Sequence, residues 1–81
     1  MLTIKILGPG CNNCKEVERI ARQAAAALAI EAKFIKVTQY DEIRKYKLIS
    51  TPGLVIDEKI VCAGRIPTLA ETTTYLVNAL V

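Results

Sequence analysis

Two cysteines three residues apart, Cys11 and Cys14, have the type and spacing that could do chemistry in this 81-residue sequence. They follow an apolar segment and the turn-forming residues Gly8-Pro9-Gly10, and they stand where a helical pattern begins. Side chains three apart on a helix lie side by side, about 5–6 Å apart at Cβ, so a modest adjustment brings two sulfurs within bonding range. The N–H groups and positive dipole end of a helix start favour a thiolate. The pair can therefore form and reopen a disulfide.

The same pair could instead hold a soft metal ion, because thiolates suit Cu(I). Copper chaperones of the ferredoxin-like kind also place CxxC between the first strand and the first helix. Their order is β-α-β-β-α-β, however, and they usually carry methionine two residues before the first cysteine, where this chain has Pro9. A closed zinc site needs four Cys or His ligands, and the chain has three cysteines and no histidine. Disulfide exchange is favoured, Cu(I) binding is the alternative, and no structural metal site is expected.

Length and charge limit the possible classes of protein. The chain fits one domain, residues 1–81, with no linker or repeat. Eleven basic against eight acidic residues give a net charge of +3. No basic cluster is interleaved with aromatic side chains, so nucleic-acid binding is not expected.

The location is predicted from hydropathy and from the cysteine count. The longest apolar run, residues 24–30, is too short to span a bilayer, and no export signal precedes the first strand-like segment. Three cysteines, an odd number, do not suit the disulfide scaffold of a small secreted module. We therefore expect a cytoplasmic protein with no membrane partner.

Hydrophobic periodicity predicts alternating strands and helices. Residues 2–7 and 31–37 read as strands, and residues 54–56 and 60–62 as a hairpin whose tip is Asp57-Glu58. The first helix covers about residues 12–29, with its buried face at Val17, Ile20, Ala21, Ala24 and Leu28.

Capping signatures predict two further helices. Thr38 with Asp41 is a weak signature for a short helix ending near Tyr46 or Lys47. Thr68 with Glu71 is a clearer capping box. The inward stripe of this last helix is expected at Leu69, Thr73, Leu76 and Leu80.

The resulting order is β-α-β-α-β-β-α. The strand-helix-strand unit implies a right-handed parallel crossover, and the hairpin adds an antiparallel pair. The sequence therefore predicts an α/β fold with a four-stranded mixed sheet and helices on both faces. Ligands usually bind at the carboxyl ends of strands in such sheets, and Cys11 follows one of these ends.

This order, with CxxC at a helix start and Thr51-Pro52 before the hairpin, resembles the thioredoxin fold. The chain is most similar, over essentially its whole length, to the small thioredoxin- and glutaredoxin-like redox-active disulfide proteins of prokaryotes. The resemblance implies that Cys11 is the attacking thiolate and Cys14 the resolving thiol. It also implies that Pro52 is cis, that the Thr51 backbone binds an extended substrate segment, and that Gly64 lines the groove.

The resemblance further implies the partners. The substrates would be proteins with disulfide bonds, and the electrons would come from a flavoprotein of the thioredoxin reductase type. The expected enzyme is a monomeric protein-disulfide reductase with no bound cofactor beyond its redox-active disulfide.

The sequence departs from longer thioredoxins near the cysteines. It has Gly10 in place of tryptophan, Asn12-Asn13 in place of Gly-Pro, and Lys5 in place of a buried acid, which leaves the proton acceptor for Cys14 unassigned. Asn12 and the segment Gly64-Arg65-Ile66 also differ from glutaredoxins, which favours protein disulfides over glutathione.

Four further expectations concern individual residues. Gly10, Asn12, Asn13 and Lys15 are candidates for shaping the loop or tuning the thiol. Gly8 and Gly10 permit the tight turn. Cys62 is a small buried hydrophobic residue, and Tyr40 packs half-buried.

Overall fold

Strands and helices follow one another in the predicted order. The computed structural model describes residues 2–10, 12–46 and 51–80. Its elements are β1 (Leu2–Leu7), α1 (Asn12–Ala27), β2 (Ala32–Val37), α2 (Tyr40–Arg44), β3 (Gly53–Ile56), β4 (Lys59–Ala63) and α3 (Leu69–Leu80).

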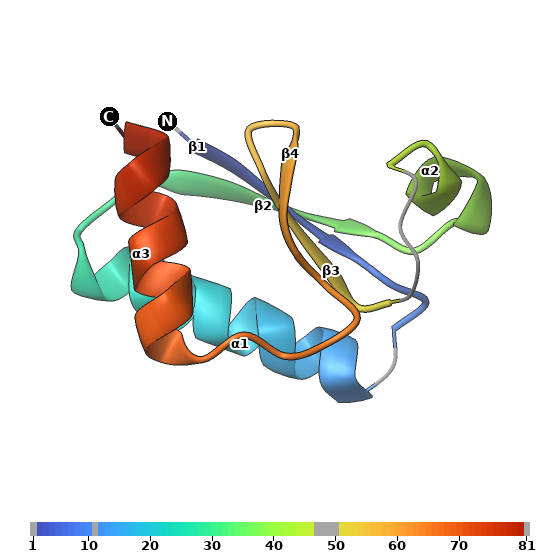
Figure 1. Ribbon diagram of the computed structural model, residues 1–81, viewed down its shortest axis with the longest axis horizontal. Helices are drawn as coiled ribbons and strands as arrows, with labels where there is room; N and C mark the ends of the chain where they lie inside the picture. The colour runs from blue at the N-terminus through green and yellow to red at the C-terminus, as the bar shows by residue number, and fades with distance from the viewer. Residues whose placement is uncertain (1, 11, 47–50, 81) are drawn as a thin grey trace.

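The four strands form one mixed sheet in the order β2-β1-β3-β4. β1 pairs with β2 in parallel and with β3 antiparallel, and β3 pairs antiparallel with β4. α1 and α3 lie together on one face, and α2 lies on the other (Figure 1). The predicted mixed sheet with helices on both faces is confirmed.

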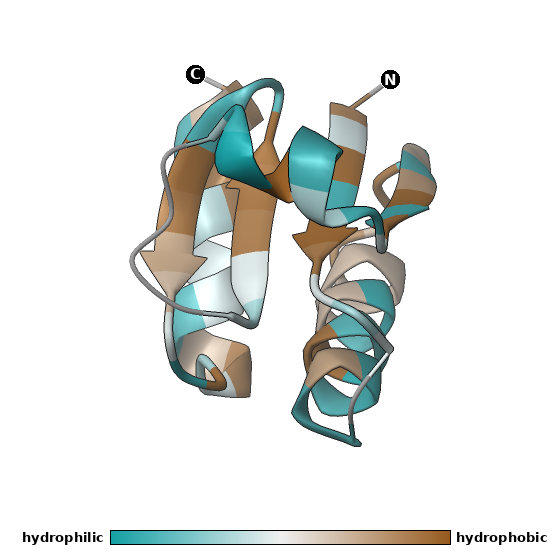
Figure 2. Cartoon of the chain, turned by 90° about the vertical axis from the view of Figure 1, so that its right-hand side faces the viewer, coloured by the Kyte–Doolittle hydropathy of each residue, from teal (hydrophilic) through white to brown (hydrophobic). Residues whose placement is uncertain are grey.

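Alternation along β1 separates the core into two clusters. Leu2, Ile4 and Ile6 face α1 and α3, whereas Leu7 points to the opposite face and packs with Ile43 of α2. The larger cluster is completed by residues of α1, β3, β4 and α3: Cys14, Val17, Ala21, Ala24, Ala25, Leu54, Ile56, Cys62 and Leu76. Figure 2 shows the hydrophobic strands inside and hydrophilic residues on the outer turns of α2.

The ends of five elements differ from the prediction. β3 begins at Gly53 instead of residue 54, β4 spans Lys59–Ala63 instead of residues 60–62, and α2 ends at Arg44, before the predicted Tyr46. α1 stops at Ala27, two residues early, and Ala29 takes a positive φ of 55°. β2 begins at Ala32 instead of residue 31. Thr38 does not cap α2: the N-cap is Gln39, which makes no side-chain capping bond, and Asp41 pairs with Arg44 instead. Lys47, the later predicted end of this helix, lies outside the described residues.

The hairpin turns at Asp57 and Glu58 as predicted, although neither is glycine and their φ angles are 49° and 69°. Contacts with β1 hold this unfavourable backbone. The Thr3 N–H donates to Asp57 Oδ1 at 2.9 Å, and the Asp57 N–H donates to the Thr3 carbonyl at 2.9 Å. Lys5 pairs with Glu58 at 2.6 Å. The tip is therefore fixed by its neighbours, as positive-φ residues require.

The capping box of α3 is confirmed, because the Glu71 N–H donates to Thr68 Oγ1 and the Thr68 N–H to Glu71 Oε1, both at 3.0 Å. The expected inward stripe is correct at Leu76 but wrong at its two ends. Leu69 is 39% exposed and Leu80 57%, whereas Thr72 and Leu76 are fully buried. Thr72 can be buried because its hydroxyl donates to the Thr68 carbonyl at 2.9 Å, which satisfies its polar atom within the helix.

Leu76→Ala should lower the free energy of unfolding by about 2–5 kcal/mol, because it leaves a cavity between α3 and the sheet. Urea denaturation followed by circular dichroism measures the change. Leu80→Ala is the matched control, since the same atoms are removed from an exposed site of the same helix, and we expect less than about 1 kcal/mol. Equal losses in the two variants would contradict the assignment of the buried face.

Candidate active site

The second cysteine of the CxxC motif lies at the carboxyl end of β1. Cys14 belongs to the first turn of α1 and is 5% exposed. Cys11 lies outside the described residues. α1 begins at Asn12, so the motif stands at a helix start as the sequence predicts. The first turn of α1 holds no acidic side chain that would oppose a negative charge there.

Gly8 lies against Cys14 for a reason that the sequence does not reveal. The expectation that Gly8 serves only the turn is incomplete, because its φ is not positive, whereas that of Gly10 is +91°. A Cβ atom at residue 8 would overlap Cys14 Sγ and would lie 3.9 Å from the Cβ of Thr51. Gly8, Cys14 and Thr51 therefore meet at one point. Sequence reasoning missed this contact since no local pattern marks a glycine that is needed for space.

The Thr51–Pro52 peptide bond is cis, as the resemblance implies. Pro52 is buried and Thr51 is half-buried. The Gly64 N–H donates to the Pro52 carbonyl at 2.8 Å, and Gly64 has a φ of +77°. The structure therefore brings Thr51, Pro52 and Gly64 together beside Gly8, although Gly64 follows β4 and is remote in sequence from the other three.

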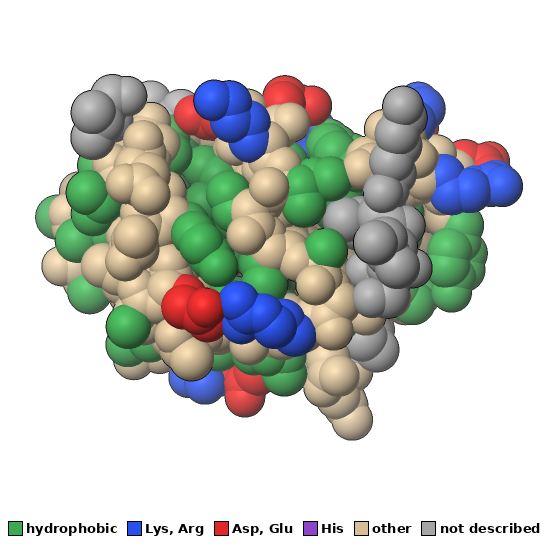
Figure 3. Space-filling view, viewed as in Figure 1, with side chains coloured by type: hydrophobic (Ala, Val, Ile, Leu, Met, Phe, Trp, Pro, Cys, Tyr) green, Lys and Arg blue, Asp and Glu red, His purple; other side chains and the backbone are tan. Residues whose placement is uncertain are grey.

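The remaining candidates surround the helix start. Asn12, Asn13 and Lys15 are exposed on the first turn of α1, and Gly10 is exposed before it. Tyr40 is 63% exposed, so the expected half-buried packing is wrong: α2 covers only one corner of the sheet and leaves its first residue outside. On the face shown in Figure 3, charged side chains are scattered rather than gathered into one patch.

Lys5 stands where longer thioredoxins carry a buried acid, and its side chain is engaged on the α2 face of the sheet. Lys5 Nζ donates to the Tyr46 hydroxyl at 2.8 Å and to Glu58 Oε1 at 2.6 Å. The hydroxyl of Tyr46 donates to Glu58 Oε2 at 3.2 Å. The hydrogen bond with Glu58 raises the pKa of Lys5, and the same bond lowers the pKa of Glu58. This group links the end of α2 to the hairpin tip.

The third cysteine is buried in β4, as predicted. Cys62 is 7% exposed, and its Sγ lies 3.7 Å from the carbonyl oxygen of Arg65. The Arg65 guanidinium holds Glu71 by two hydrogen bonds of 2.9 and 2.8 Å. The arginine beside Gly64 is thus neutralised by a carboxylate that also caps α3.

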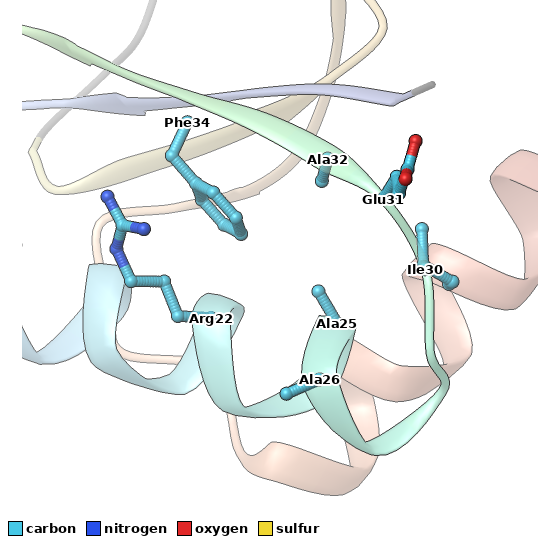
Figure 4. Close-up of a pocket in the computed structure, with 7 residues that line it drawn as sticks. All are labelled: Arg22, Ala25, Ala26, Ile30, Glu31, Ala32 and Phe34. Atoms are coloured by element: carbon cyan, nitrogen blue, oxygen red, sulfur yellow. The ribbon is translucent and has the colours of Figure 1, made fainter.

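Other features of the described residues lie away from this site. A pocket between α1 and β2 is lined by Arg22, Ala25, Ala26, Ile30, Glu31, Ala32 and Phe34, at the opposite end of α1 (Figure 4). Within the described ranges, no group of three or more His, Cys, Asp and Glu residues could hold a metal ion. None of the helices placed by the structure is long and apolar enough to cross a membrane.

Comparison with known proteins gives a family match and two close curated relatives. The family model described as "Thioredoxin domain" matches residues 2–76. The protein "Thioredoxin" of Methanothermobacter thermautotrophicus is 38% identical over 76 residues, which cover 94% of this chain and 99% of that protein. "Thioredoxin" of Methanocaldococcus jannaschii is 37% identical over 71 residues, which cover 88% of this chain and 81% of that protein.

The stability of the fold should depend on pH through Glu71, which lies in the first turn of α3. The hydrogen bonds from Arg65 lower the Glu71 pKa from 4.5 to about 2, so this carboxylate stabilises the fold fully above pH 4.5. That contribution should be lost as the pH falls from 4.5 to 2. The melting temperature should fall less steeply with decreasing pH in Glu71→Gln than in the wild type, when both are measured across this range.

Arg65→Gln is the control for the cause of this effect, because it removes the guanidinium but keeps the capping box with Thr68. We expect an intermediate pH dependence in this variant. A Glu71→Gln profile parallel to that of the wild type would contradict the prediction.

Proposed function

Since this chain belongs to the thioredoxin family, we propose that it reduces disulfide bonds in other proteins by cycling Cys11 and Cys14 between dithiol and disulfide. One observation supports these roles above others. The sulfur of Cys14 is buried beside Gly8 and Thr51, next to the cis-Pro52 bond and at the start of a helix. A buried second thiol beside an exposed helix start suits a resolving cysteine, which reacts with its neighbour rather than with free substrate.

The exchange proceeds in two steps. The Cys11 thiolate attacks one sulfur of the substrate disulfide, which forms a mixed disulfide and releases the other substrate sulfur as a thiolate that takes up a proton. Cys14 then loses its proton to solvent, attacks the Cys11 sulfur and displaces the second substrate thiolate. The protein ends with a Cys11–Cys14 disulfide, and the substrate has gained two electrons and two protons.

The helix start supplies the polarity that favours a thiolate. A helix N-terminus stabilises a nearby negative charge by about 0.3–1 kcal/mol, and by up to about 2 kcal/mol where the site is partly buried. Asn12 and Asn13 add no opposing charge, and Lys15 is a cation that faces solvent. We assign Gly10, Asn12, Asn13 and Lys15 to the shaping and tuning of this loop.

We assign Thr51, Pro52 and Gly64 to the binding of an extended substrate segment, by main-chain hydrogen bonds of the kind used in strand addition. The backbone contact between Gly64 and Pro52 supports a single continuous surface. Arg65 is held by Glu71, and the segment after Gly64 offers no acidic pair of the glutaredoxin type. These features favour protein disulfides over glutathione.

The proposal extends to partners and location. A flavoprotein of the thioredoxin reductase type would return the electrons, with no bound cofactor in this chain, and the protein would act as a cytoplasmic, single-domain monomer. The Cu(I) alternative is not retained. The chain has the order β-α-β-α-β-β-α and matches the thioredoxin domain rather than a ferredoxin-like fold.

The proposal is tested by the reduction of insulin with dithiothreitol as electron donor, and the increase in turbidity measures the reaction. Cys11→Ser should abolish catalysis, because it removes the attacking sulfur. After reduction and removal of dithiothreitol, Cys14→Ser should trap a mixed disulfide with insulin that non-reducing electrophoresis detects. Cys62→Ala is the matched control, since this thiol is buried in β4, and its catalysis should be retained.

Two outcomes would contradict the proposal. One is full insulin reduction by Cys11→Ser. The other is stoichiometric, tight uptake of Cu(I) by a wild-type protein that shows no reductase activity.

A further inference from the structure

Gly8 and Cys14 contact each other in a way that the family assignment does not explain. We propose that Gly8 is a positioning residue for the resolving step: its lack of a side chain lets the Cys14 sulfur lie where it can attack the mixed disulfide. This inference rests on the proposed function, because it presumes that Cys14 is the resolving thiol. It concerns one step of that cycle and leaves the attack by Cys11 unaffected.

The two glycines of the turn are required for different reasons. Gly10 has a φ of +91°, which disfavours other residues, but among the described residues a Cβ there would meet no atom within 4 Å beyond its chain neighbours. Gly8 has no such φ, so its backbone is open to any L-residue. A Cβ at Gly8 would instead overlap Cys14 Sγ and lie 3.4 Å from Cys14 Cβ. Gly8 is therefore needed for space beside the sulfur, and Gly10 for backbone conformation.

Neither the end of β1 nor the start of α1 can shift easily to relieve this overlap. The Gly8 N–H donates to the Val37 carbonyl at 2.9 Å, and the preceding Leu7 is fully buried, so the strand end is fixed. Cys14 is buried on a helix whose next inward residue, Val17, is 1% exposed. A cysteine has a single side-chain torsion with three staggered positions. A methyl group at residue 8 would therefore turn the sulfur into another rotamer or shift the start of α1.

Such a change affects the two chemical steps unequally. Attack by Cys11 on the substrate forms the mixed disulfide without any bond to Cys14. Resolution forms the Cys11–Cys14 bond and breaks the bond between Cys11 and the substrate sulfur, and it needs the three sulfurs in line. A misplacement of about 1 Å at a reacting atom can slow a reaction about 100-fold. Gly8→Ala should therefore slow resolution selectively.

The test is a single-turnover reaction of the reduced protein with insulin, stopped by acid and analysed by mass spectrometry. In the wild type the mixed disulfide should be transient. In Gly8→Ala it should accumulate with an unchanged rate of formation and decay about 10- to 100-fold more slowly. Leu76→Ala controls for loss of stability, because it removes buried atoms from α3 and places no atom near Cys14, and it should accumulate no mixed disulfide.

A double-mutant cycle tests the contact itself in the reduced protein. Gly8→Ala should lower the folding equilibrium constant about 10-fold in the wild-type background but little in Cys14→Ala, where the overlapping sulfur is absent. Should Gly8→Ala alone fail to fold, recovery of folding by the added Cys14→Ala substitution supports the same contact.

The inference is overturned by wild-type decay of the mixed disulfide in Gly8→Ala, or by a loss of stability that is equal in both backgrounds. Failure of the proposed function has a different signature. In that case the wild type and Cys14→Ser would form no mixed disulfide at all, while the stability cycle would still report the contact.

Discussion

The space beside the Cys14 sulfur depends on the absence of a side chain at Gly8. Gly8 follows β1 and donates its N–H to the carbonyl of Val37, the last residue of β2, and a Cβ at residue 8 would lie 3.9 Å from the Cβ of Thr51. Because Cys14 belongs to α1, the same constraint acts on the position of this helix, which packs its alanine-rich face on the sheet. Three chain segments that are separate in sequence therefore meet around one sulfur atom. The sheet register and the packing of α1 matter for the chemistry because they determine whether this meeting point exists.

The two faces of the sheet contribute differently to the surroundings of Cys14. The face covered by α1 and α3 holds the larger core, which fixes α1 against β1. The α2 face holds a smaller cluster of Leu7, Ile43 and Val55, and beyond it Lys5 joins Tyr46 and Glu58. In longer thioredoxins the position of Lys5 supplies a proton acceptor. Here that position is a cation already paired with a carboxylate, so it cannot accept a proton from Cys14.

The local parts of this structure could be predicted from the sequence, and the non-local contacts could not. The order of the strands and helices and the Thr68–Glu71 capping box depend on residues a few positions apart, and both were predicted correctly. The prediction of the buried face of α3 missed Thr72, because this residue becomes an interior residue only through its hydrogen bond to Thr68. The contact of Gly8 was missed because it depends on how α1 docks. Pro52 and Gly64 were linked to the site by family resemblance, since their sequence separation gives no local signal.

The start of α1 supplies polarity through its backbone, and the charged side chain that follows Gly64 is paired. Arg65 is bound to Glu71, so this pair presents little net field. Lys15 is exposed, and a unit charge acting through water at 4 Å contributes only about 1 kcal/mol. The N–H groups at the start of α1 have no carbonyl partner within the helix, and they point along the axis out of its N-terminal end. The orientation of α1 against β1 therefore affects both the field at the thiols and the position of Cys14. A substitution that moves the helix start should alter both together, whereas a change confined to one surface charge should alter neither by much.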